Sequence, residues 1–135
     1  MESIEAAQQA LEENFAPWVR ALRPTVTEIG PERAVMEIPI TDHVMRVGGI
    51  ISGQALAALA DTTMVFACAG HFGELKPVAT TNLDTQFLRA GKGEAIRCEA
   101  RVVRAGRQVL FAKAEMSALP GHKLVASATA TFYLP

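Results

Sequence analysis

The 135-residue chain has the length of one domain, and half of its residues are hydrophobic, so a sizeable core is available. Its 13 basic and 14 acidic side chains give a formal net charge of −1, which offers no basis for binding nucleic acid or an anionic membrane. Two cysteines outside any CxxC motif and three scattered histidines do not make a zinc site. We therefore expect a single domain over residues 1–135 with no metal and no prosthetic group.

The first residues show no signal-peptide pattern, because they contain neither a basic n-region nor an apolar h-region. Two thiols in a domain of this size favour a reducing compartment. We therefore expect a cytoplasmic protein.

The N-terminal third predicts a helix followed by a β-hairpin. Residues 3–14 carry apolar side chains at helical spacing, and Ser3 is a suitable N-cap. With the proline-bracketed connector behind it, this helix makes up residues 1–20. Two candidate strands follow, at residues 25–29 and 33–40.

A long apolar helix is expected over residues 52–68, with Gly70 and Gly73 as candidate stop signals. Residues 53–73 contain one side chain that is charged at neutral pH, Asp61. The composition imitates a membrane span, but a carboxylate in the middle of a lone span is costly. A core helix that a soluble domain surrounds on all sides explains the same composition.

Four strand-like segments complete the chain, at residues 78–89, 94–104, 107–117 and 123–133. Alternation in the first of them places Thr81, Leu83 and Phe87 on one face. The strands have no crossover helices between them, so they suit an antiparallel sheet. The sequence thus predicts an α+β fold, in which an antiparallel sheet carries one hydrophobic helix on its concave face.

Asp61 is the residue most indicative of chemistry, because burying an unpaired carboxylate in an apolar helix is expensive. It is either a paired structural carboxylate or a general base or nucleophile whose pKa a dry cleft tunes. Ser52 fits an N-cap better than a nucleophile, since no Gly-x-Ser-x-Gly elbow surrounds it. The N–H of Gly53 lies at the positive end of the helix dipole and can stabilise an oxyanion.

The segment 46–64, RVGGIISGQALAALADTTM, resembles the motif of hotdog-fold acyl-CoA thioesterases of the phenylacetate-pathway, or PaaI-like, type. That motif runs Asn-x-x-Gly-x-x-His-Gly-Gly, then six residues, then an acidic residue. Gly49, Gly53 and Asp61 match its first glycine, the glycine after the histidine, and the acid. The resemblance covers roughly residues 25–133.

Three positions depart from the family pattern. Arg46 stands where the family has Asn, Ser52 replaces the motif histidine, and Gln54 replaces the last glycine. We interpret the chain as a Ser-Gly variant of the His-Gly-Gly motif. By resemblance, Arg46, Gly49, Ser52 and Gln54 contact the substrate.

The resemblance implies hydrolysis of an acyl-CoA to a free acid and coenzyme A. Asp61 is the implied general base or nucleophile, and the Gly53 N–H is the implied oxyanion donor. The two residues are eight positions apart on one helix, which is about 12 Å of rise. One helix therefore does not bring both to one thioester, and we expect a homodimer or homotetramer that shares its sites between chains.

Further candidates are less specific. Asn82 either hydrogen-bonds the thioester or an attacking water, or is an ordinary strand residue. Arg89, Lys92, Arg104 and Arg107 either bind the phosphates of coenzyme A or are solvated surface charges. A weakly catalytic acyl-CoA-binding protein is the main alternative function. An acyl-thioester hydratase or dehydratase is disfavoured, because the helix motif lacks a histidine.

Overall fold

The computed structural model describes residue 1 and residues 3–135. Its helices and strands follow in the order α1 (Ile4–Asn14), α2 (Pro17–Arg20), β1 (Thr25–Gly30), β2 (Arg33–Pro39), β3 (Met45–Arg46), β4 (Ile50–Ile51), α3 (Gly53–Phe72), β5 (Ala79–Phe87), β6 (Ala95–Ala105), β7 (Val109–Leu119) and β8 (Lys123–Tyr133).

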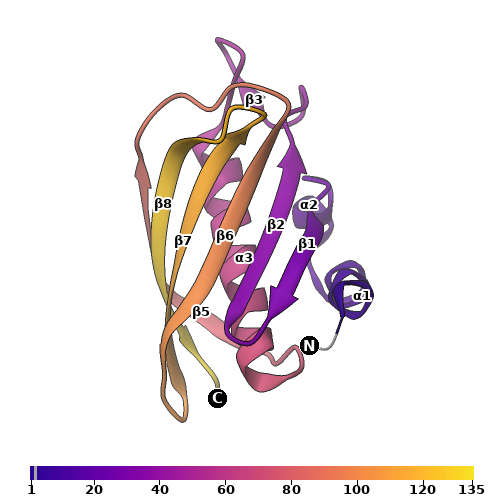
Figure 1. Ribbon diagram of the computed structural model, residues 1–135, viewed down its shortest axis with the longest axis vertical. Helices are drawn as coiled ribbons and strands as arrows, with labels where there is room; N and C mark the ends of the chain where they lie inside the picture. The colour runs from indigo at the N-terminus through magenta and orange to yellow at the C-terminus, as the bar shows by residue number, and fades with distance from the viewer. Residues whose placement is uncertain (2) are drawn as a thin grey trace.

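Six of these strands form one antiparallel sheet in the order β1-β2-β6-β7-β8-β5. The sheet wraps around α3, which packs chiefly against β2, β6 and β7 (Figure 1). The strands β3 and β4 form a small ribbon just before α3. The predicted α+β hotdog arrangement, with a short N-terminal helix, is confirmed.

The two edges of the sheet differ in how they are covered. The helix α1 lies against β1, and the side chain of Gln8 accepts a hydrogen bond from the backbone N–H of Val26 at 2.8 Å. At the other edge lies β5, which no strand covers and whose nine residues are all exposed except the half-buried Thr85. This edge is therefore a template for pairing with another strand.

The helix α3 begins as predicted and ends one turn later than predicted. Ser52 is its N-cap, with the side chain accepting from the N–H of Ala55 at 3.2 Å. Gly70 does not stop the helix, and Gly73 does, by taking the left-handed conformation at φ 83°.

Gly70 instead allows a close approach between α3 and the β1–β2 turn. A Cβ atom at position 70 would lie 2.1 Å from the carbonyl oxygen of Gly30. The missing side chain thus sets the distance between helix and turn, which the sequence pattern does not reveal.

By length and composition α3 could span a membrane, but 61% of its most apolar window is buried inside the protein. The predicted core helix is therefore confirmed, but the domain does not surround it on all sides. Cys68 and Cys98 are free and buried, and burial raises the pKa of each thiol to about 12.

The face assignment predicted for β5 is wrong at its start. A register shift between Thr80 and Asn82 breaks the alternation. Thr80 pairs with the buried Phe132, and Leu83 pairs with the buried Ala130, so both point toward α3. Thr80, rather than Thr81, therefore faces the helix.

Gly70→Ala tests the close approach of helix and turn. Alanine normally stabilises a helix relative to glycine, by up to about 1 kcal/mol. Here we expect a loss of about 1–3 kcal/mol in the free energy of unfolding, measured in urea, because the new methyl group overlaps the Gly30 carbonyl. The control is Gly30→Ala, where an added Cβ meets nothing within 4 Å. Equal stability of the two variants would contradict the packing.

Candidate active site

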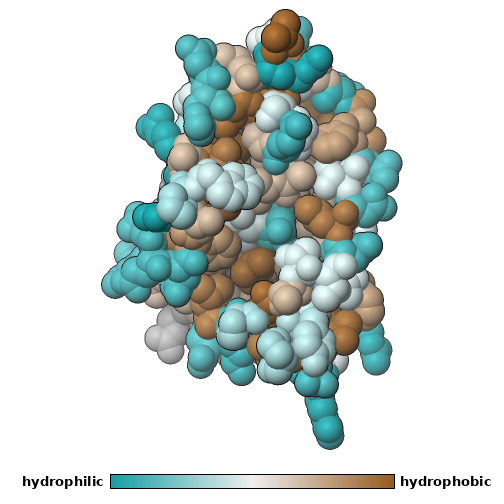
Figure 2. Space-filling model, turned by 180° about the vertical axis from the view of Figure 1, so that it is seen from behind, coloured by the Kyte–Doolittle hydropathy of each residue, from teal (hydrophilic) through white to brown (hydrophobic). Residues whose placement is uncertain are grey.

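The sheet leaves one stripe of α3 uncovered. Ala57, Ala58, Asp61 and Val65 are half-buried along it, and Gln54 is exposed at its N-terminal end. These positions recur at helical spacing, so they share one face. Figure 2 shows the molecule from the helix side, where apolar surface lies along the middle of the face and hydrophilic residues gather mostly toward its margins.

Asp61 lies in the middle of this stripe and is held by a residue of β5. Its Oδ1 accepts a hydrogen bond from the hydroxyl of Thr80 at 2.8 Å. Burial raises the pKa of Asp61 above its usual value, and the Thr80 hydroxyl offsets part of that rise. A half-buried carboxylate with a raised pKa is a stronger base than a solvated one, as a general base requires.

The N-terminus of α3 presents two backbone donors. Among the described residues, no acceptor bonds the N–H of Gly53 or of Gln54, since the Ser52 side chain caps Ala55 instead. The ring of Phe87 lies against Gly53, where an added Cβ would meet its Cζ atom at 3.2 Å. The helix dipole favours a developing negative charge at this end.

The β3–β4 ribbon fixes the approach to this N-terminus. Gly48 and Gly49 both have positive φ, at 103° and 74°, which side-chain-bearing residues rarely adopt. The N–H of Gly49 donates to the carbonyl of Arg46 at 3.2 Å, and the N–H of Ser52 donates to the carbonyl of Val44 at 2.8 Å. Gly49 and Ser52 thus shape the loop.

Arg46, Gly53 and Arg89, three predicted site residues, meet at one cavity of about 320 Å³, which Phe87 also lines. A second cavity of about 470 Å³ continues past Arg89 and is lined by Lys92 and Lys123.

The two cavities share Arg89 and Ala90. None of Arg89, Lys92 and Lys123 takes part in the ion pairs found among the described residues. The arrangement forms a path from the Gly53 N–H to a cluster of positive charge, which suits an elongated ligand with an anionic end.

Two predicted residues lie away from Asp61. Asn82 pairs with Thr131, one register position from the inward-facing Leu83, so it points to the outer face of the sheet. Arg107 lies in the β6–β7 turn, at the end of the sheet where β5 begins, whereas Arg89 follows the end of β5. A nine-residue strand is about 30 Å long, so one chain does not bring both arginines to one nucleotide.

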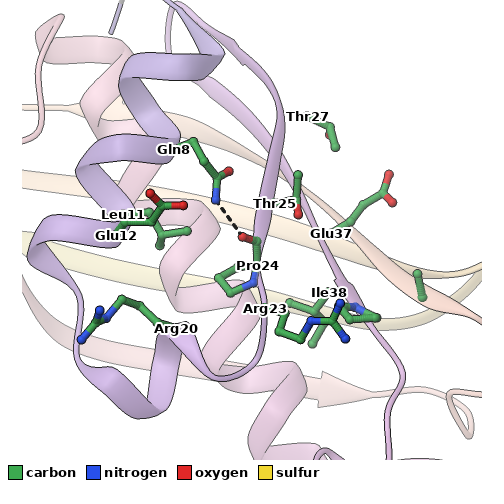
Figure 3. Close-up of a pocket in the computed structure, with 12 residues that line it drawn as sticks. Gln8, Leu11, Glu12, Arg20, Arg23, Pro24, Thr25, Thr27, Glu37 and Ile38 are labelled. Carbon is green, nitrogen blue, oxygen red and sulfur yellow. Dashed lines mark hydrogen bonds between the residues drawn. The ribbon is translucent and has the colours of Figure 1, made fainter.

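Another cavity, of about 510 Å³, contains none of the predicted site residues. It lies between the N-terminal helices and the strands β1 and β2 (Figure 3). Gln8 donates from its Nε2 to the carbonyl of Pro24 at 3.1 Å across its wall. Its separation from Asp61 and Gly53 leaves the uncovered side of α3 as the candidate active site.

Residues 48–125, more than half of the chain, match the thioesterase superfamily. The chain belongs to this superfamily. The match includes Gly49, Gly53, Asp61 and Thr80.

Individual relatives extend the match over nearly the whole chain. A Pseudomonas aeruginosa protein named "Putative esterase PA0474" is 29% identical over 91% of this chain and 96% of its own length. The structure of the conserved protein PA5202 from the same organism is 31% identical and superimposes with a TM-score of 0.83, covering 92% of this chain and 98% of that one. The Escherichia coli PaaI protein, from the phenylacetic acid degradation operon, has the same fold, with a TM-score of 0.84 at 22% identity and coverage of 98% and 95%.

Sequence reasoning missed Thr80 and Lys123. The motif pattern carries no signal for Thr80, because its contact with Asp61 depends on the β5 register shift. Lys123 approaches Arg89 only through the pairing of β8 with its neighbours.

Thr80→Val tests the Asp61 hydrogen bond. The Thr80 hydroxyl stabilises the ionised carboxylate, so its removal should raise the pKa of Asp61 further. A ¹³C NMR titration of the side-chain carboxyl measures this directly. Thr80→Ser keeps a donor and should restore the wild-type value. The control is Thr81→Val, because Thr81 donates to the Thr131 carbonyl and should leave the Asp61 titration unchanged. A Thr80→Val variant that titrates like wild type would contradict the contact.

Proposed function

We propose that this protein is an acyl-CoA thioesterase, which hydrolyses an acyl-CoA to a free acid and coenzyme A. One observation carries the proposal: a thioesterase-superfamily chain holds a half-buried carboxylate, Asp61, on the uncovered stripe of its central helix. The raised pKa of Asp61 and the unbonded N–H at Gly53 supply the two functions that hydrolysis needs.

In the proposed reaction, Asp61 either takes a proton from an attacking water or attacks the carbonyl itself. The first route adds the water oxygen to the acyl carbon, and the thioester oxygen becomes an oxyanion that the Gly53 N–H stabilises. The C–S bond then breaks, and the proton goes to the departing thiolate. In the second route the C–S bond breaks as an acyl anhydride forms at Asp61, and coenzyme A leaves as the thiolate. Water then hydrolyses the anhydride, which releases the free acid, restores the Asp61 carboxylate and supplies the proton for the thiolate.

The two groups belong to different chains in this proposal. Gly53 and Asp61 lie about 12 Å apart along α3, which exceeds the reach of one carbonyl group. Two antiparallel helices related by a two-fold axis bring Asp61 close to Gly53 of the partner subunit if they cross midway, at Ala57. The small side chains of Ala57 and Ala58 allow such a close approach, and the uncovered edge of β5 supplies a second contact.

The nucleotide of coenzyme A is proposed to bind at the cavity that Arg89, Lys92 and Lys123 line. Its phosphates are anionic, and these three cations lie beyond the cavity that contains Gly53. Antiparallel pairing of two β5 strands also brings Arg107 of the partner subunit toward the Arg89 end. Arg107 is therefore retained in the proposal only as a residue of the second chain.

Asp61→Asn tests the role of the carboxylate. We expect thiol release from a panel of short, medium and long acyl-CoAs to fall by about 100-fold or more in kcat, because asparagine neither accepts the proton nor attacks. The control is Asp84→Asn, which removes an exposed carboxylate from the outer face of β5. Similar activity of Asp61→Asn and wild type would contradict the assignment, and binding of acyl-CoA by a wild-type protein that releases no thiol would indicate a binding protein.

Mixing two inactive variants tests the shared site. The first carries Asp61→Asn. The second carries Gly53→Pro, which removes the N–H and suits the first position of a helix. Half of the dimers formed by random exchange are mixed, and each has one intact site, so roughly a quarter of wild-type activity should return.

Gly53→Ala is the matched control for the proline variant, because it adds the same Cβ beside Phe87 and keeps the N–H. It should retain activity, which would separate loss of the donor from displacement of the ring. Mass spectrometry verifies that the subunits have exchanged. If activity does not recover after that exchange, the shared site is rejected.

A further inference from the structure

An apolar cavity of about 370 Å³ lies beyond Asp61, away from the Gly53 end of α3. Its apolar lining includes Phe15, Val65, Leu75 and Val78. These residues come from the segment after α1, from α3, and from the loop that leads into β5. Neither Arg46 nor Arg89 lines it, so it is separate from the path toward the cationic cluster.

Neither Asp61 nor Thr80 lines this cavity, but each lies close in the chain to a residue that does. Val65 follows Asp61 by one helical turn, about 6 Å of rise on the same face. Val78 precedes Thr80 by two residues, so an extended chain puts both side chains on one face. A group attached to a carbonyl at Asp61 therefore meets apolar walls within one turn of the helix.

We propose that this cavity is the acyl subsite and that it selects straight medium-length acyl groups of roughly 6–10 carbons. The proposal rests on the proposed thioesterase function and adds the substrate class. At the ~30 Å³ that a water occupies in the liquid, the cavity has room for about a dozen nonhydrogen atoms.

The volume and the lining of the cavity limit the length of the acyl chain. The ring of Phe15 stacks on the buried ring of Phe66, with centroids 5.5 Å apart and planes at 19°, so the core supports the wall that Phe15 forms. Asn14 and Lys76 form the polar part of the lining, with the Lys76 ammonium held 4.9 Å over the Phe72 ring. A chain that outgrows the cavity meets a charge rather than apolar surface, which disfavours long fatty acyl groups.

The apolar walls set the lower limit on the length of the acyl chain. An acetyl group leaves the surfaces of Val65, Leu75 and Phe15 unfilled, and each methylene lost from an apolar pocket reduces kcat/KM by about tenfold or more. The rate constant kcat/KM should therefore rise from acetyl-CoA to a maximum near octanoyl-CoA and fall again toward palmitoyl-CoA.

Val65→Trp tests the subsite by filling it from the helix side. We expect the ratio of kcat/KM for octanoyl-CoA to that for acetyl-CoA to fall by about tenfold or more. Leu75→Trp fills the same cavity from the loop and should lower the same ratio, so the test survives if one variant fails to fold. The matched control is Val103→Trp, since Val103 is 62% exposed on β6 and does not line the cavity. An unchanged ratio in both folded cavity variants would overturn the proposal.

Binding of thioether analogues tests the acyl subsite independently of thioester hydrolysis. S-octyl-CoA and S-ethyl-CoA cannot be hydrolysed, and calorimetry should show tighter binding of the octyl compound to wild type and loss of that difference in Val65→Trp. Equal affinities for the two compounds in wild type would reject the acyl subsite. Absence of thiol release from every acyl-CoA, with the octyl preference intact, would reject the thioesterase function and keep the subsite.

Discussion

The sheet covers only part of the surface of α3, and the proposed chemistry depends on this incomplete coverage. The covered side packs against β2, β6 and β7 and is mostly apolar, with residues such as Leu59 and Phe66 fully buried. Asp61 is on the uncovered side, where its carboxylate keeps part of its hydration and gains one hydrogen bond from Thr80. A sheet that enclosed the helix completely would desolvate this charge at a cost of several kcal/mol. The gap in the sheet therefore permits an acid in an otherwise apolar helix.

The two ends of the face that this gap leaves uncovered differ in chemical character. At the N-terminal end of α3, the cations Arg89, Lys92 and Lys123 favour negative charge, and so do two backbone N–H groups that donate to none of the described residues. Beyond Asp61, the helix borders apolar walls. An acyl-CoA has a matching polarity, with an anionic nucleotide at one end and an apolar chain at the other. In the proposed dimer the reacting bond meets Asp61 of one chain and Gly53 of the partner subunit. The apolar cavity then belongs to the chain that supplies Asp61, and the cations beyond Gly53 belong to the partner subunit.

The edge strand β5 links the core to this face. Its register shift turns Thr80 toward Asp61 and leaves Asn82 on the outer face. Its far end places Phe87 against Gly53, so one strand contacts both proposed catalytic positions of α3. The other sheet edge is closed by Gln8, which bonds the Val26 N–H, and this contrast leaves β5 as the edge available to a second chain.

The sequence by itself determined the fold class and the extent of most strands, and it singled out Asp61 and Gly53 as candidate site residues. Hydrophobic periodicity carries this information, and an isolated acid in an apolar helix is visible without coordinates. Ser52 as the N-cap was equally readable, because capping depends on neighbours within one turn. Only the tertiary structure decided that Thr80 supports Asp61, that Arg89 and Arg107 lie at opposite ends of the sheet, and that Gly70 continues the helix. Each of these depends on strand register or on contacts between residues far apart in the chain, and a one-residue shift in pairing reverses the face of every side chain without altering the pattern of the sequence.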